Sequence, residues 1–128
     1  MDEIIDMLAH ERLQAWKLCH ELVLAVYAAT ASFPKHELYG LTSQARRAAF
    51  SAAVNIAEGA AKRGPTEFRR FLDISVGSLA ELAYILRLAK DLALLDESNW
   101  LALERIRRQA GRLTWKLYAS IRDAVKQV

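Results

Sequence analysis

The sequence predicts an all-α fold, an antiparallel up-down-up-down bundle of four helices. Apolar residues recur at intervals of three and four through most of the chain, as they do on the buried face of a helix. No segment shows the strict alternation of apolar and polar residues that marks a half-buried strand. The segments between the expected helices are short, so neighbouring helices should run antiparallel.

Length and composition predict one domain over residues 1–128. With 53% apolar and 26% charged residues, such a chain buries roughly two-thirds of its unfolded surface, enough for a core without disulfides. Cys19 is the only cysteine, which excludes an intrachain disulfide and favours a reducing compartment. We expect no signal peptide, and no uncharged apolar run reaches the roughly 18 residues of a membrane span. A cytoplasmic protein without a membrane partner is therefore expected.

The N-terminal part combines a lead-in with the first long helix. Residues 1–11 are expected to form a short helix capped by Asp2, and the long helix is predicted over about 12–31. His20 is interpreted as a core or interface histidine, because no second histidine lies at helical spacing. The long helix carries two apolar faces, which predicts contact with another subunit. The face expected in the core comprises Leu13, Trp16, His20, Val23, Tyr27 and Thr30. The face expected to meet the other subunit comprises Ala15, Leu18, Leu22, Ala25 and Ala29.

The second helix is predicted to be the centre of the bundle. It follows a loop over 32–40 and runs over about 41–62, with Thr42 or Ser43 as its N-cap. Its many alanines keep the helix thin. Polar residues recur along it at steps of four, four and three, so they share one stripe. This stripe consists of Arg47, Ser51, Asn55 and Glu58.

Two further helices complete the predicted bundle. Pro65, whose fixed φ suits a first helical position, begins a helix that runs to about Leu94. Asp96 is the expected N-cap of the last helix, over about 97–126. One apolar stripe of that helix should face the core. It consists of Leu103, Ile106, Ala110, Leu113, Leu117 and Ile121.

A polar network is expected between the second and third helices. In the structural interpretation, Arg47 and Asn55 satisfy a buried Glu58 and thereby define the helix register. The alternative is a carboxylate pair, Glu58 and Glu81, that binds a metal or transfers protons. Di-iron bundles need a Glu-x-x-His on each of two helices, and this chain has none. We therefore expect no catalytic residue, metal or cofactor, and a network of Arg47, Ser51, Asn55, Glu58, Ser78 and Glu81.

In this interpretation Glu58→Ala lowers stability by about 2 to 5 kcal/mol, because it leaves a buried partner unpaired.

Positive charge is concentrated in the last segment. Residues 97–128 contain seven basic and three acidic residues, a net charge of +4, whereas the rest of the chain has eleven and twelve, a net charge of −1. Four of these basic residues, at spacings of three, four and four, share one face of the helix. Most are arginines, which match phosphate geometry better than lysine does. We interpret this basic stripe as a nucleic-acid-binding surface, formed by Arg105, Arg108, Arg112 and Lys116.

Other interpretations of the last helix stay open. The basic stripe is otherwise a solvated face, or pairs with Asp73, Asp91 or Glu104. Aromatic residues on the same helix either belong to the core or an interface, or stack on unpaired bases. They are Trp100, Trp115 and Tyr118.

The turn before the third helix offers a second basic patch. Gly59 and Gly64 have the spacing of the glycines of a phosphate-binding loop, but Pro65 stands where the lysine belongs, and the turn follows a helix. Nucleotide hydrolysis is therefore not expected. Lys62 and Arg63 lie beside the free N–H groups of a helix start and are predicted to contact phosphate, with a solvated basic turn as the alternative.

The middle of the chain resembles a known family. The runs FPKHELYGLTSQARRAAFSAAVNIAEG and EFRRFLDISVGSLAELAYILRLAKDLALL are similar to the four-helix-bundle proteins encoded in intervening sequences of bacterial large-subunit ribosomal RNA genes. The resemblance covers about 15–117. Ala52 and Ala53 replace a β-branched or proline pair, which should affect only packing. The motif residues are Pro34, Glu37, Gly40, Gln44, Arg47, Ala48, Ser51, Asn55, Ala57, Glu58, Gly59, Phe71, Ser78 and Glu81.

The resemblance implies that the bundle assembles into a homo-oligomeric, pentameric ring. It also implies a relation to the accessory protein of diversity-generating retroelements, a basic pentameric barrel that binds reverse transcriptase and nucleic acid. We therefore expect a non-enzymatic oligomer that binds RNA or DNA through the basic stripe. The alternative is a protein-interaction scaffold without nucleic-acid binding.

Overall fold

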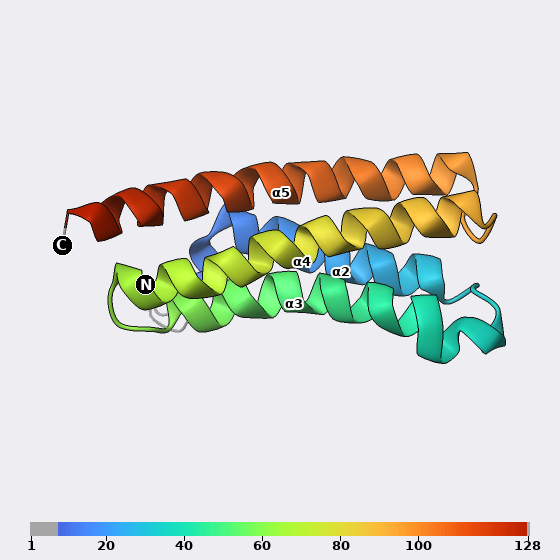
Figure 1. Cartoon of the computed structure of the whole chain (residues 1–128), viewed down its shortest axis with the longest axis horizontal. Helices are drawn as coiled ribbons and strands as arrows, with labels where there is room; N and C mark the ends of the chain where they lie inside the picture. Colours follow the sequence, from blue (N-terminus) through green and yellow to red (C-terminus); the bar gives the residue numbers. More distant parts are fainter. Residues whose placement is uncertain (1–7, 128) are drawn as a thin grey trace, which may run out of the picture.

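The computed structural model describes residues 8–127, which form four long helices and no strand. Consecutive helices run antiparallel (Figure 1), as predicted. Each long helix packs against two others, so that α3 and α5 both lie between α2 and α4. The bounds are α2 (Gln14–Thr30), α3 (Ser43–Ala60), α4 (Pro65–Asp91) and α5 (Glu97–Lys126).

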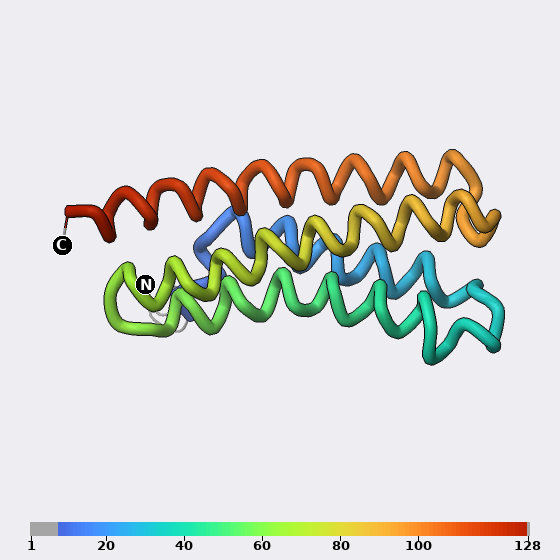
Figure 2. Tube along the Cα trace, viewed as in Figure 1, coloured from blue at the N-terminus to red at the C-terminus, as the bar shows by residue number. Residues whose placement is uncertain are grey.

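Short helical turns occupy the two N-terminal connections. A 3-10 turn, η1 (Ala9–Arg12), precedes α2, while Asp2, the cap expected for the lead-in, lies outside the described residues. The predicted loop between α2 and α3 contains η2 (Lys35–Glu37) and a π-helical turn, η3 (Leu38–Thr42). The path of this connection is followed most easily in Figure 2.

Local signals position two of the helix starts correctly. Pro65 is the first residue of α4 and follows Gly64, whose φ of 83° suits glycine. Asp96 caps α5 by accepting a 2.7 Å hydrogen bond from the Asn99 backbone N–H. Thr42 occupies the predicted N-cap position of α3, but its side chain makes no capping hydrogen bond, and the chain enters the helix directly from η3.

Small residues of α3 are buried against the neighbouring helices. Ala45, Ala49 and Ala52 are completely buried. Near the end of α3, a Cβ built on Gly59 would lie 2.8 Å from Phe71 Cβ. Real Cβ contacts are longer than this, so the glycine permits the local approach of the two helices. The predicted small side chains of this helix are therefore buried, but α3 is not central, because each of the four helices packs against two others.

The core face of α2 differs from the predicted one. His20 and Tyr27 were expected to face the core, but both are exposed, and His20 stacks on Trp16 with ring centroids 5.0 Å apart. Apolar residues surround most of α2, so periodicity alone did not identify the inner face. Fully buried positions instead include Cys19, Leu22 and Val26.

Cys19 joins α2 to α5. Its Sγ lies 3.6 Å from Thr114 Oγ1, and both side chains are completely buried. Burial raises the pKa of the Cys19 thiol to about 11, although the hydrogen bond with Thr114 lowers it slightly. The thiol therefore stays protonated at neutral pH, as expected for a structural cysteine.

None of the described helices combines the length and apolar character that a membrane crossing requires.

Candidate nucleic-acid interface

The inner face of α5 follows the predicted apolar stripe. Leu103 and Ala110 are buried, and the other members of the stripe are partly buried against the core. The regular spacing of this stripe holds the opposite face of a 30-residue helix outward.

All four residues of the basic stripe lie on that outward face. Arg105, Arg108, Arg112 and Lys116 are exposed. Arg108 Nε lies 3.4 Å from Glu104 Oε2, whereas the other three form no ion pair with any described residue. The alternative pairing of the stripe with Asp91 does not occur among the described residues, where Asp91 pairs with Arg87 on its own helix. Most of the stripe's charge therefore faces solvent.

A buried ion pair lies beneath the stripe. Glu104 accepts hydrogen bonds of 2.8 Å from Arg107 Nε and 2.6 Å from Arg107 Nη2. Its side chain is only 6% exposed, and that of Arg107 is 18% exposed. Burial by itself raises the pKa of Glu104, but the hydrogen bonds and charge of Arg107, together with Arg108, bring it below its ordinary value.

Sequence reasoning missed this pair. From the sequence, Arg107 counts only among the seven basic residues of the last segment, and Glu104 only as one possible partner of the stripe. Their i,i+3 spacing was the available signal. It did not reveal that both side chains would be covered by the rest of the bundle.

The three aromatic side chains of α5 have different surroundings. Trp100 is partly buried, and Lys90 Nζ lies 4.3 Å from the centroid of its ring. Tyr118 is partly buried against the core. Trp115 is 51% exposed and stacks on Tyr118 with ring centroids 5.3 Å apart. Trp115 is thus the member of this group that remains open to a ligand.

The second basic patch lies at the same end of the bundle as the C-terminal part of α5 (Figure 1). Lys62 and Arg63 are both exposed in the connection between α3 and α4. Lys62 Nζ lies 5.5 Å from the centroid of the Phe71 ring. Lys62 therefore lies beside the first turns of α4, near the free N–H groups at the start of that helix.

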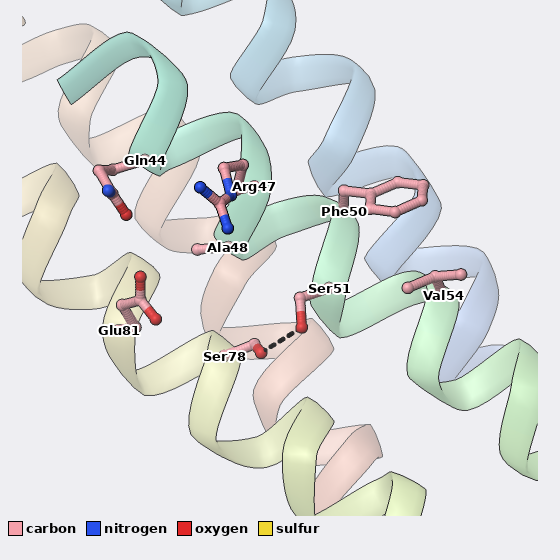
Figure 3. Close-up of a pocket in the computed structure, with 8 residues that line it drawn as sticks. All are labelled: Gln44, Arg47, Ala48, Phe50, Ser51, Val54, Ser78 and Glu81. Atoms are coloured by element: carbon pink, nitrogen blue, oxygen red, sulfur yellow. Dashed lines mark hydrogen bonds between the residues drawn. The ribbon is translucent and has the colours of Figure 1, made fainter. Parts of the chain in front are cut away.

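A polar groove runs between α3 and α4 (Figure 3). Ser51 Oγ and Ser78 Oγ are 2.7 Å apart, and Asn55 Nδ2 donates hydrogen bonds to the carbonyl oxygen and Oγ of Ser51. The groove encloses about 500 Å³, and its lining residues are Gln44, Arg47, Ala48, Phe50, Ser51, Val54, Ser78 and Glu81.

The structure assembles only part of the expected polar network. Ser51, Asn55 and Ser78 are hydrogen-bonded together, and Arg47 and Glu81 line the same groove. The expectation of a buried Glu58 is wrong for the described chain, because Glu58 is exposed. Asn55 uses its amide group on Ser51, one helical turn earlier.

The alternative interpretation, a carboxylate pair of Glu58 and Glu81, is also not assembled. Glu81 lies beside Ala48 and Ser51 in the groove. Glu58 is seven residues beyond Ser51, roughly 10 Å further along α3 at 1.5 Å per residue. Among the described residues, no group of three or more histidine, cysteine or acidic side chains is placed to hold a metal ion.

The fold and surface define a class of protein: a small antiparallel four-helix bundle with a basic outer face on its last helix. The sequence pattern of the 23S rRNA-intervening sequence proteins matches residues 11–116. The chain belongs to this family, which confirms the resemblance noted from its central helices. A comparison with curated proteins found no match to the chain.

Proposed function

We propose that this protein is a non-enzymatic, oligomeric single-domain bundle that binds RNA or DNA by contacting phosphates. The observation that carries the proposal is the exposure of Arg105, Arg108, Arg112 and Lys116 on one face of α5. A guanidinium group can donate two parallel hydrogen bonds to the oxygens of one phosphate. Exposed cations also release counterions from a nucleic acid when the protein binds it. Lys62 and Arg63 form the second contact. The solitary, buried Cys19 supports a reducing, cytoplasmic setting.

Assembly would strengthen this interaction. The family resemblance implies a pentameric ring, and five chains of formal charge +3 would carry +15 in total. Repetition of the basic stripe around an axis raises the local potential and therefore the rate of association with a polyanion. Exposed apolar side chains such as Leu24, Tyr27 and Phe50 support the use of further helix faces in contacts between subunits.

The first test is a titration of a labelled structured RNA and a DNA duplex, followed by fluorescence anisotropy at about 50 and 200 mM salt. Several phosphate contacts should make the affinity fall by orders of magnitude between these conditions. Arg108→Glu/Arg112→Glu should weaken binding to every sequence alike, because phosphate contacts carry no sequence information.

A matched control is Lys17→Glu/Lys35→Glu, which changes the net charge equally at two exposed positions on other elements. The control should bind nearly as well as the wild-type protein. Equal binding by both double variants would reject the basic stripe as the site.

The alternative function, a protein-interaction scaffold, is favoured by a different surface. A groove of about 360 Å³ beside α2 and α3 is lined by the exposed side chains of Tyr27, Leu38, Tyr39 and Phe50, and by Arg46. Exposed aromatic and arginine residues are enriched in protein interfaces. Specific capture of a protein that is lost in Tyr39→Ser/Phe50→Ser, together with no binding to RNA or DNA, would favour this function.

A further inference from the structure

We propose that Trp115 stacks on an unpaired base, so that the ligand of the basic stripe is a single strand or a loop. This inference rests on the proposed function. It specifies which form of nucleic acid the α5 surface fits. The starting observation is that Trp115, 51% exposed, stands on the same helix as the four basic residues of the stripe.

The position of Trp115 within the stripe supports this role. Arg112 lies three residues before it, Arg108 seven before it, and Lys116 immediately after it. Residues at i−3 and i−7 share a helix face with residue i, so the indole lies among the cations that would hold the phosphates. A nucleotide offers both groups together, a phosphate for an arginine and a base for the ring.

The packing beneath the ring favours a preformed platform. Tyr118 is partly buried against the core and stacks on Trp115 with an angle of 28° between the ring planes. Arg122 Cζ lies 6.0 Å from the Trp115 centroid and 5.9 Å from the Tyr118 centroid. These contacts restrict the indole, so less side-chain freedom is lost when a base stacks on it.

The other two tryptophans are not available in the same way. Trp16 is partly buried, and the rings of His10 and His20 lie 4.6 and 5.0 Å from it. Trp100 is partly buried below Lys90. Trp115 alone among the tryptophans combines exposure with flanking positive charge.

The geometry points to an unpaired base because the faces of bases inside a duplex are already occupied by their neighbours. In single strands and loops the bases can be splayed out and stacked on aromatic side chains. Base stacking on one aromatic residue is worth roughly 1–3 kcal/mol, or roughly 5- to 150-fold in affinity. A duplex that the protein contacts only through its phosphates would gain no affinity from base stacking.

The test compares a labelled oligouridine strand with a duplex of the same length, at about 50 mM salt, for the full chain and three variants. Trp115→Ala should lower affinity for the single strand at least about 5-fold and leave duplex affinity unchanged. Trp115→Phe should recover most of the loss. Tyr84→Ala is the matched control, because Tyr84 is 69% exposed but lies on α4. It should behave as wild type.

The outcomes separate this inference from the proposed function. If the wild-type protein binds neither probe, the proposed function fails and the inference fails with it. If both probes bind in a salt-dependent manner and Trp115→Ala affects them equally or not at all, only the stacking role is overturned. A change in oligomeric state of Trp115→Ala, measured by sedimentation, would also overturn it, by assigning the ring to a subunit interface.

Discussion

Glu104 and Arg107, one turn apart on α5, form a buried ion pair in which Arg107 Nη2 lies 2.6 Å from Glu104 Oε2. The carboxylate also lies 3.4 Å from Arg108 Nε, so it connects the buried pair with the exposed basic stripe. A buried charge is tolerated only when it is paired and hydrogen-bonded, and here both conditions are met. Glu104 therefore contacts one covered arginine and one exposed arginine of the same helix.

Removal of that residue should destabilise the protein. Glu104→Ala leaves Arg107 without its partner, and we expect a loss of about 3 kcal/mol in the free energy of unfolding, at the low end for a broken buried pair because Arg107 is partly exposed. Chemical denaturation measures this loss. Glu67→Ala, in the exposed pair with Arg70, should cost less than about 1 kcal/mol. Similar losses for both variants would contradict a special role for the buried pair.

The same pair should make stability depend on pH. The folded-state pKa of Glu104 lies below its ordinary value of 4.5, so folding favours the ionised carboxylate. Its contribution is therefore fully present above the unfolded-state pKa and declines as the pH falls through the folded-state value. The difference in unfolding free energy between wild type and Glu104→Gln should be constant near neutral pH and shrink below about pH 4.5. A difference that grows on acidification would contradict this sign.

Two glycine substitutions should have opposite effects. In Gly59→Ala the new Cβ would lie 2.8 Å from Phe71 Cβ and 2.9 Å from Phe68 Cδ1, and we expect a loss of about 1–3 kcal/mol through overpacking. A Cβ on Gly77 meets nothing within 4 Å, so Gly77→Ala should gain up to about 1 kcal/mol of helix propensity. Thermal unfolding of the two variants checks both signs. Stabilisation of both would show that α4 can move away from α3 without cost.

Glu58 should be unimportant for the stability of the chain. Because the side chain is exposed, Glu58→Ala should change the free energy of unfolding by less than about 0.5 kcal/mol, in place of the 2 to 5 kcal/mol expected of a buried residue. By contrast, Ser75→Ala removes a buried 2.8 Å hydrogen bond to the Ala52 carbonyl oxygen and should cost about 1 kcal/mol. Urea denaturation compares the two. A larger loss for Glu58→Ala than for Ser75→Ala would refute the exposed placement.

The helices were predicted well where the signal is local. The bounds of α5 and its Asp96 cap agree with the prediction, because one clean apolar stripe and a capping carboxylate need no information from the rest of the fold. The start of α4 at Pro65 agrees for the same reason. Since the family match covers residues 11–116, the central motif was specific enough to identify the family as well.

Predictions failed where the deciding information was long-range. On α2, an almost continuous apolar surface is compatible with several inner faces, and contact with α5 selected Cys19 in place of His20. On the polar stripe of α3, spacing placed Glu58 with Ser51 and Asn55. The antiparallel register that brings Ser51 to Ser78 leaves Glu58 further along α3 and exposed.

Periodicity and caps were sufficient to predict four antiparallel helices and an outward basic stripe, because turn-to-turn spacing determines which residues share a helix face. Only tertiary packing decided which face of α2 is buried, that Glu104 and Arg107 form a covered pair, and that Trp115 stays open while Trp100 does not. The physical reason is that burial depends on which neighbouring helix covers a residue. That cover is set by contacts between segments far apart in the chain, such as Cys19 with Thr114 and Ser51 with Ser78.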